Sequence, residues 1–158
     1  MKRIFSPWRM KYIKDADKQT ECIFCSLPRD SSDRASLIVE RGKLGFVVLN
    51  RFPYTSGHIM VAPYAHQATI ELLDEKTQAE MMSLISHSIR VLRSVYRPDG
   101  FNVGANIGYA AGAGFAEHVH FHIVPRWVGD TNFMSTTGDV RVLPEDLETT
   151  WKRIKEAW

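Results

Sequence analysis

The chain has little of several features that would decide its class at once. It carries only two cysteines, which excludes a dense disulfide framework as the source of its stability. It has no apolar run of about 18 residues, the length that crosses a bilayer, and the segment 1–20 carries charges where a signal peptide would be apolar. Its 20 Lys and Arg nearly balance 18 Asp and Glu, with no long basic run to follow a nucleic acid. We therefore expect a cytoplasmic protein that binds neither a membrane nor a nucleic acid.

What the chain does contain is enough apolar sequence for one packed core. Its 158 residues are 44% hydrophobic, which suits a single domain and is too short for two domains of ordinary size. We expect one domain over 1–158, in which 1–20 forms an irregular N-terminal arm.

The pattern of apolar residues predicts strands and two helices. Runs bounded by turn signals predict strands at 36–40, 44–49, 58–62 and 101–106, and a last strand through the histidines at 118–122. Asp74 is placed to cap a long amphipathic helix with the apolar stripe Met81, Ile85, Ile89 and Leu92. A C-terminal helix over 144–158 has the stripe Leu147, Trp151, Ile154 and Trp158. Strand runs with separated helices favour an α+β fold built on an antiparallel sheet.

The most informative pattern is a row of three alternating histidines, His118, His120 and His122. In an extended strand they would line one face, with the intervening apolar residues on the other. Three uses are open: hydrogen-bonded structural residues, ligands of a metal ion, or a nucleophile that attacks phosphorus. The small-residue loop 108–114 just upstream favours the nucleophile, because residues without bulky side chains let backbone N–H groups approach a phosphate.

Three segments together resemble a known family. The run HVHFHIVP from His118 to Pro125 matches the signature of the histidine-triad family, and NRFPYTSGHIMVAP at 50–63 and CIFC at 22–25 are similar to its upstream elements, in family order. The runs PRWVGDTNF at 125–133 and PWRMKYI at 7–13 are similar to the bacterial branch that includes diadenosine tetraphosphate (Ap4A) phosphorylases.

The resemblance implies a role for each site residue. His120, the middle histidine, would take the nucleotidyl group from a mono- or dinucleoside polyphosphate as a covalent nucleotidyl-histidine. His58 and His122 would contact phosphate oxygens or orient the nucleophile, Asn50 would bind the ribose, and Asn106 would begin the phosphate loop. Mg²⁺ could enter with the polyphosphate, and no organic cofactor is expected.

One position departs from the family pattern and bears on the acceptor. Where many relatives place Ser or Thr, three residues before the first histidine of the row, this chain has Phe115, which leaves only the backbone N–H groups of Gly114 and Phe115 for the leaving group. We therefore expect orthophosphate as the acceptor, which makes the protein a phosphorylase. The alternatives are a hydrolase of dinucleoside polyphosphates or nucleoside phosphoramidates, and a nucleotide-binding sensor.

The cysteine pair Cys22 and Cys25 supplies half of a tetrahedral zinc site. The chain offers His58, His66, His87 and His118 to complete it; His87, off the apolar stripe of its helix, is expected at the solvated surface. Two reduced thiols without metal, or a redox-active pair, are the other interpretations. The resemblance implies a structural zinc held by Cys22, Cys25, His66 and His118, and a homodimer in which two chains join their sheets.

Overall fold

In the computed structural model the described residues are 21–130 and 145–158, so the predicted arm at 1–20 and Pro144 lie outside them. Five strands form one antiparallel sheet in the order β1-β2-β3-β5-β4. The strands are β1 (Ile38–Arg41), β2 (Gly45–Leu49), β3 (Ile59–Pro63), β4 (Gly100–Ala105) and β5 (Phe121–Arg126). The antiparallel α+β architecture predicted from the sequence is confirmed.

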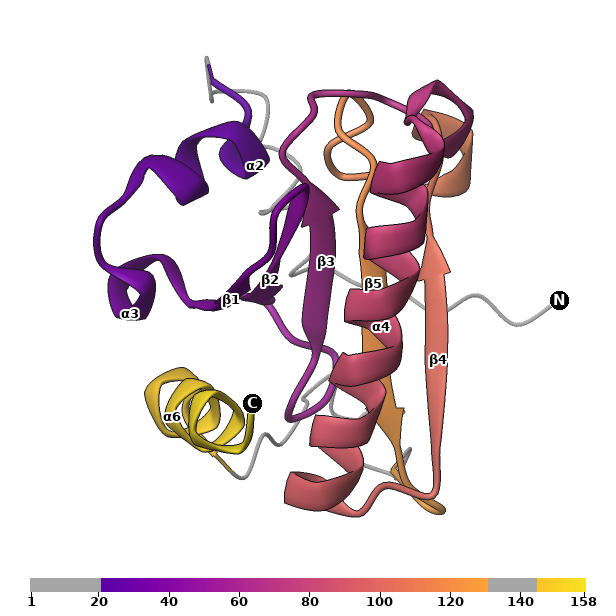
Figure 1. The fold of residues 1–158 in the computed structure, drawn as a ribbon. Coiled ribbons are helices and arrows are strands. Elements are labelled where there is room, and N and C mark those ends of the chain that lie inside the picture. The colour runs from indigo at the N-terminus through magenta and orange to yellow at the C-terminus, as the bar shows by residue number, and fades with distance from the viewer. Residues whose placement is uncertain (1–20, 131–144) are drawn as a thin grey trace, which may run out of the picture.

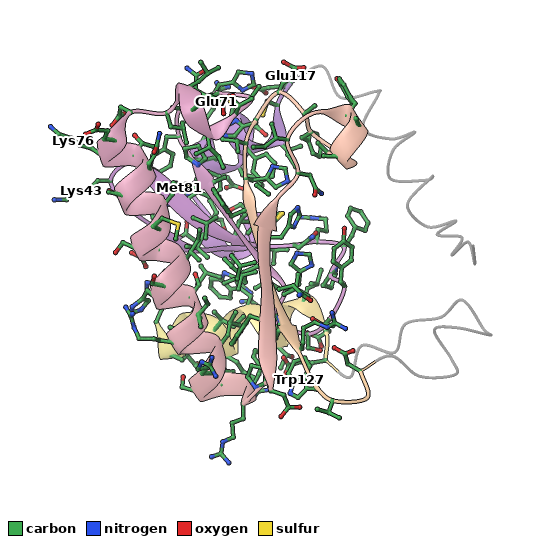
Figure 2. All side chains as sticks on the ribbon, turned by 90° about the vertical axis from the view of Figure 1, so that its right-hand side faces the viewer. Lys43, Glu71, Lys76, Met81, Glu117 and Trp127 are labelled. Atoms are coloured by element: carbon green, nitrogen blue, oxygen red, sulfur yellow. The ribbon has the colours of Figure 1, made fainter. Side chains whose placement is uncertain are left out.

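The two faces of the sheet are covered by different elements, because successive side chains of a strand point to opposite faces. One face packs against the long helix α4 (Glu75–Tyr96), which in Figure 1 runs roughly along the strands in front of β5, and Figure 2 shows Met81 of α4 directed toward the strands. This core holds the buried side chains of Val47, Leu49, Ile59, Val61, Met81, Ile85, Leu92 and Ile123. The helix begins as predicted, since the Asp74 side chain accepts a hydrogen bond from the backbone N–H of Thr77 at 2.9 Å.

The other face carries a smaller core under the N-terminal part of the described chain. It contains Phe24, Ile38, Phe46, Val48, Met60 and Ala62. Phe24 belongs to α2 (Ile23–Ser26), which is followed by η1 (Leu27–Arg29) and α3 (Asp33–Ser36). Two further turns, η2 (Ile70–Leu72) and η3 (Tyr109–Ala111), lie in the connections before α4 and after β4. The face with Phe24 is the one that the histidines share, because Met60 pairs with His122 in the sheet.

The C-terminal helix α6 (Leu147–Ala157) lies against the β1 edge of the sheet, as Figure 1 shows. Trp151 Nε1 donates to the carbonyl oxygen of Ile38 at 2.8 Å, and Lys155 Nζ donates to that of Val39 at 2.6 Å. These contacts satisfy carbonyl groups that an edge strand otherwise leaves unpaired. At the opposite edge, residues 102–104 of β4 are exposed.

The predicted bounds are wrong at three places. The strand predicted over 36–40 begins only at Ile38, because Ser36 belongs to α3. The last strand begins at Phe121, so only His122 of the three histidines lies in it. The ladder between β3 and β5 stops here because Pro63, at the end of β3, has no N–H to donate, and the N–H of Val119 donates instead to the carbonyl of Gln67 at 2.7 Å. The C-terminal helix begins at Leu147 instead of 144, because Asp146 caps it through the N–H of Thr149.

His87 also departs from its prediction. It is half-buried, not fully solvated, with its ring edge-on to Trp158 at 4.6 Å between centroids. Since Trp158 follows α6, this residue covers a face of α4 that the helical period alone assigns to solvent.

None of the helices in the two described ranges is long and apolar enough to cross a membrane.

A half-buried carboxylate fastens α6 to the end of α4. Glu145 accepts hydrogen bonds from Tyr96 at 2.7 Å, from Thr150 at 2.8 Å and from Arg153 at 2.6 Å. Burial opposes ionisation of this carboxyl, but the three hydrogen bonds outweigh it and lower the pKa of Glu145. Because the folded pKa is the lower one, the carboxylate contributes stability above its ordinary pKa of about 4.3, and that contribution is lost as the pH falls through the folded value.

Replacing Glu145 by Gln should lower the free energy of unfolding by about 1–3 kcal/mol, because it weakens three hydrogen bonds to one half-buried group. Denaturant unfolding at pH 7 measures the change, and the difference from the wild type should shrink below pH 4.5. Glu148→Gln is the matched control, since its ion pair with Arg34 joins side chains that are 67% and 66% exposed and should cost less than about 0.5 kcal/mol. Equal losses in the two variants would contradict the fastening role of Glu145.

Candidate active site and metal centre

Four potential metal ligands from distant parts of the chain meet beside the N-terminal helix. Cys22 caps α2 and Cys25 lies within it, His66 follows β3, and His118 precedes β5. One ligand atom from each lies within 4.8 Å of the other three. These are the four residues that the resemblance implied, whereas His58 and His87 lie outside the cluster.

The spacing of the four atoms suits a tetrahedral ion. Zinc bonds of about 2.05 Å to nitrogen and about 2.3 Å to sulfur require N···N edges of about 3.3 Å and S···N edges of about 3.6 Å. The Nδ1 atoms of His66 and His118 are 3.3 Å apart. Cys22 Sγ and Cys25 Sγ lie 3.4 and 3.6 Å from His118 Nδ1, and Cys25 Sγ lies 3.3 Å from His66 Nδ1. The residues therefore fit a closed structural zinc site, with all four positions taken by the protein.

The protonation of the cluster agrees with a cation at its centre. His118 Nε2 lies 2.9 Å from the carbonyl oxygen of Pro63, which places the proton on Nε2 and leaves the Nδ1 lone pair directed at the cluster. Burial lowers the pKa of His118 to about 4, so the ring is neutral at pH 7. Burial, together with the neighbouring Cys22, raises the pKa of Cys25. Two thiolates this close are unfavourable by themselves, and a divalent cation would offset their repulsion.

His120 has the geometry of a neutral nucleophile. Its ring is 5% exposed, and its Nδ1 lies 2.8 Å from the carbonyl oxygen of His118. The proton therefore lies on Nδ1, and Nε2 keeps its lone pair. Burial lowers the pKa of His120, although the hydrogen bond to His118 opposes the shift. At neutral pH the imidazole is thus uncharged and needs no separate base before it attacks.

His58 and His122 form a pair with defined tautomers. The backbone N–H of Tyr54 donates to His58 Nδ1 at 3.1 Å, so His58 carries its proton on Nε2. That Nε2–H donates a hydrogen bond to His122 Nδ1 at 3.0 Å, so the proton of His122 lies on its Nε2. The ring of His122 is 4.9 Å from that of His120. The Nε2–H group of His122 is therefore the donor that lies beside the His120 ring.

The turn before His58 requires glycine. Gly57 has a φ of +77°, and a Cβ at this position would lie 3.0 Å from the Tyr96 ring. The turn brings Asn50, at the end of β2, against the His58 ring, with its Nδ2 at 3.3 Å from His58 Nδ1. Asn50 Oδ1 accepts from the N–H of Phe52 at 2.9 Å. The structure therefore brings together Asn50, His58 and His122 as neighbours.

Three further predicted site residues, Asn106, Gly114 and Phe115, lie in the connection between β4 and β5. Asn106 follows the end of β4 and is half-buried, and the loop after it contains the short turn η3. Gly114 and Phe115 precede the histidine segment, and the Phe115 ring packs into the smaller core, edge-on to Phe24 at 5.9 Å. The side chain at this position thus packs in the smaller core.

Sequence reasoning missed two participants. Phe24 stacks on the His120 ring, and the carbonyl of Pro63 orients His118. The aromatic residue between the two cysteines is visible in the sequence, but its contact with His120 depends on how α2 folds back over the sheet. Pro63 acts through its backbone carbonyl oxygen, which every residue has, so the amino-acid type at this position could not indicate the role.

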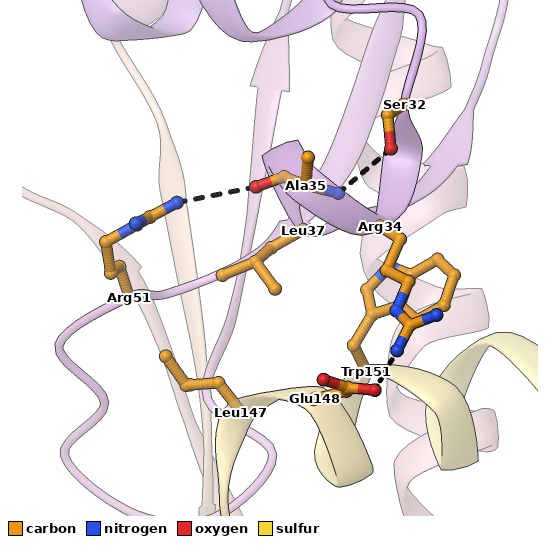
Figure 3. Close-up of a pocket in the computed structure, with 8 residues that line it drawn as sticks. All are labelled: Ser32, Arg34, Ala35, Leu37, Arg51, Leu147, Glu148 and Trp151. Atoms are coloured by element: carbon orange, nitrogen blue, oxygen red, sulfur yellow. Dashed lines mark hydrogen bonds and ion pairs between the residues drawn. The ribbon is translucent and has the colours of Figure 1, made fainter.

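A separate cavity lies away from the histidines. It has a volume of about 440 Å³ and opens between α3 and α6, where Figure 3 shows Arg34 and Arg51 on its rim and Leu37, Leu147 and Trp151 along its walls. Arg34 is paired with Glu148. None of the site residues described above lines this cavity, so it contributes nothing to their chemistry.

Comparison with known proteins identifies the family and the fold. A family model described as "HIT domain" matches residues 32–128. The chain is 39% identical over 165 residues to a protein of Mycobacterium tuberculosis named AP-4-A phosphorylase, and the match covers 100% of this chain and 85% of that protein. A hypothetical histidine triad nucleotide-binding protein from Sulfolobus tokodaii has a similar fold, with a TM-score of 0.69 at 27% identity, over 86% of this chain and 91% of that one. A zinc-bound histidine triad family protein from Mycobacterium smegmatis has the same TM-score of 0.69 and identity of 27%, over 87% of this chain and 92% of that one.

Proposed function

This chain belongs to the HIT domain family, and from that premise we propose that it cleaves dinucleoside polyphosphates of the Ap4A type by nucleotidyl transfer through His120, with orthophosphate as the acceptor. The single observation that carries the proposal is the His120 ring. It is neutral, with its proton fixed on Nδ1 and its Nε2 lone pair available. The Mycobacterium tuberculosis relative, named AP-4-A phosphorylase, supports the choice of substrate and acceptor.

The first step follows from that tautomer. The Nε2 lone pair of His120 attacks the α-phosphorus of one adenylyl group, the P–O bond to the next phosphate breaks, and ATP leaves. The imidazole becomes an adenylyl-imidazolium, which keeps its Nδ1–H bonded to the His118 carbonyl at 2.8 Å. No proton has to leave His120, so the fixed tautomer is productive as it stands.

The second step returns the histidine to its starting state. An orthophosphate oxygen attacks the adenylyl phosphorus, the P–N bond breaks, and its electron pair returns to Nε2. The products are ADP and neutral His120. The N–H of His122, held by His58 at 3.0 Å, is suited to donate to a phosphoryl oxygen as negative charge builds on it.

The metal has a structural part in this proposal. We propose zinc at Cys22, Cys25, His66 and His118, where it would cross-link the cysteine helix to the segment that carries His120. Mg²⁺ would enter with the polyphosphate.

The protein would act in the cytoplasm as a homodimer that pairs two β4 edges, which the exposure of residues 102–104 supports.

Product analysis with and without phosphate tests the acceptor. Incubation of the protein with Ap4A and orthophosphate should give equal amounts of ADP and ATP, and radioactive phosphate should appear in ADP. Without phosphate, turnover should fall at least about tenfold, because water has no charge for the phosphate-binding groups to hold. Chromatography of the nucleotides separates the products. AMP in place of ADP at saturating phosphate would establish a hydrolase instead.

A further inference from the structure

The turn between the two cysteines places an aromatic ring on the nucleophile. Phe24, which is 1% exposed, stacks on the His120 ring with centroids 4.4 Å apart and planes 29° apart. Its ring is also 5.3 Å from that of His118. Phe24 thus contacts one metal-ligand candidate and the candidate nucleophile from a position between Cys22 and Cys25.

A second ring backs the first. Phe115 packs edge-on to Phe24, with centroids 5.9 Å apart and planes 84° apart. Stacked and edge-on contacts are the favoured geometries of aromatic pairs. Phe115, Phe24 and His120 therefore form a column of three rings, which we call the aromatic column, and the residue that replaces the hydroxyl of many relatives is part of it.

The aromatic column restricts a motion that the hydrogen bond of His120 leaves open. The bond from Nδ1 to the His118 carbonyl restrains one side of the ring, but a single hydrogen bond still permits small coupled rotations about χ1 and χ2 that tilt the ring plane. A ring stacked on its face opposes the tilt and so keeps Nε2 directed at one point. Misplacement of a reacting atom by about 1 Å can cost about 100-fold in rate.

Both restraints on His120 originate in the four-ligand cluster. The acceptor carbonyl belongs to His118, and the stacking ring lies between Cys22 and Cys25. From this arrangement we propose that Phe24 is a positioning residue, which holds the His120 ring in its attacking orientation and makes that orientation depend on the intact cluster. The inference rests on the proposed function of His120 and adds a use for the metal site beyond stability.

Two leucine variants of the zinc-loaded protein test the positioning role. Phe24→Leu removes the stacked ring, and Phe46→Leu is its matched control. Phe46 is 0% exposed, lies in the same core and stacks on Tyr64, not on a histidine of the site. In single-turnover reactions with Ap4A, Phe24→Leu should slow formation of adenylyl-His120 by about 10- to 100-fold, while KM, measured in the steady state, should change less than twofold. Phe46→Leu should slow it less than twofold.

The ring of His120 itself provides a readout that does not depend on turnover. In NMR spectra of the zinc-loaded protein, the carbon-bound ring protons of His120 should lie upfield because they face Phe24. Phe24→Leu should move them downfield, and Phe46→Leu should not. Elemental analysis should find one zinc per chain in both variants, which separates a loss of stacking from a loss of metal.

Zinc depletion tests the dependence on the cluster. Removal of zinc with a chelator should slow the wild type about tenfold or more and move the His120 ring protons downfield. The same treatment should slow Phe24→Leu by a clearly smaller factor than the wild type, since one of the two restraints is already absent and only the bond to the His118 carbonyl remains to be disturbed. Near-ultraviolet dichroism gives the folded fraction for each sample, and rates are expressed per folded chain.

The outcomes separate this proposal from the one on which it rests. Equal slowing of Phe24→Leu and Phe46→Leu, or equal sensitivity of both to zinc removal, would overturn the positioning role. Complete unfolding on zinc removal would overturn the proposed dependence of the His120 orientation on the cluster, because zinc would then be needed for the whole fold and would have no specific effect on this ring. A wild-type protein that forms no adenylyl-His120 would refute the proposed function instead, while the ring-proton shifts would still report on the stacking.

Discussion

Replacing His120 by Asn should reduce Ap4A cleavage by at least about 10³-fold, the scale of loss when a covalent nucleophile is removed. The reason lies in the Nε2 lone pair, which the Nδ1 bond to the His118 carbonyl leaves free for attack. An amide nitrogen carries no comparable lone pair, so Asn can fill part of the space without replacing the chemistry. Nucleotide affinity should change by less than about tenfold, since the phosphate and ribose contacts fall to other residues.

Intact-protein mass spectrometry measures the same loss directly. The wild type, stopped early in the reaction without phosphate, should gain the mass of one adenylyl group, and His120→Asn should gain none. His87→Asn is the control, because His87 lies on α4 and packs on Trp158, outside the site. Turnover retained in His120→Asn would exclude covalent catalysis at this position. Turnover lost in both variants would point to a general defect in folding.

Replacing Cys22 by Ser should remove zinc from the protein and lower the free energy of unfolding by about 3–4 kcal/mol. An ion bound at a free concentration about 1,000 times its dissociation constant stabilises the folded state by about 4 kcal/mol. Cys22 joins a segment near the start of the described chain to His118, 96 positions away, so the ion would cross-link residues that are distant in sequence. Serine is a weaker zinc ligand than a thiolate, and three ligands would remain.

Elemental analysis of protein purified without chelator measures the zinc, and thermal unfolding with and without chelator measures its contribution. The wild type should hold one zinc per chain and lose stability when the chelator is added, whereas Cys22→Ser should respond little. His87→Asn again serves as the control, since it removes a histidine outside the cluster. A wild type with less than about a tenth of an equivalent of zinc would contradict the proposed metal site.

Local sequence signals predicted the strands and the two longer helices, but not the short helices α2 and α3. The four-residue spacing of apolar side chains on α4 matches its buried face, because a long helix repeats the same environment several times. The strands of the sheet were found in the same way, from short apolar runs between turn signals. The cluster of Cys22, Cys25, His66 and His118 came from family resemblance, since their spacing along the chain contains no information on which histidine completes the set.

The errors arise where distant segments decide the local structure. The strand predicted through His118 begins only at Phe121, because the ladder depends on Pro63 in another strand. His87 was expected at the surface, but Trp158 covers it. The stacking of Phe24 on His120 depends on the fold of α2 over the sheet. In each case the deciding partner lies far away in the sequence, beyond the reach of any periodicity.

The unequal edges of the sheet limit how far the protein can assemble. Trp151 and Lys155 occupy carbonyl groups of β1, so of the two outer strands described, β4 is the one that remains open for pairing. If β4 pairs with β4 of a second copy, each chain uses its open edge once, and growth terminates at a closed pair related by twofold symmetry. Without α6, each chain would present two edge strands, β1 and β4, with unpaired backbone groups, and pairing of these edges between chains could propagate into fibres.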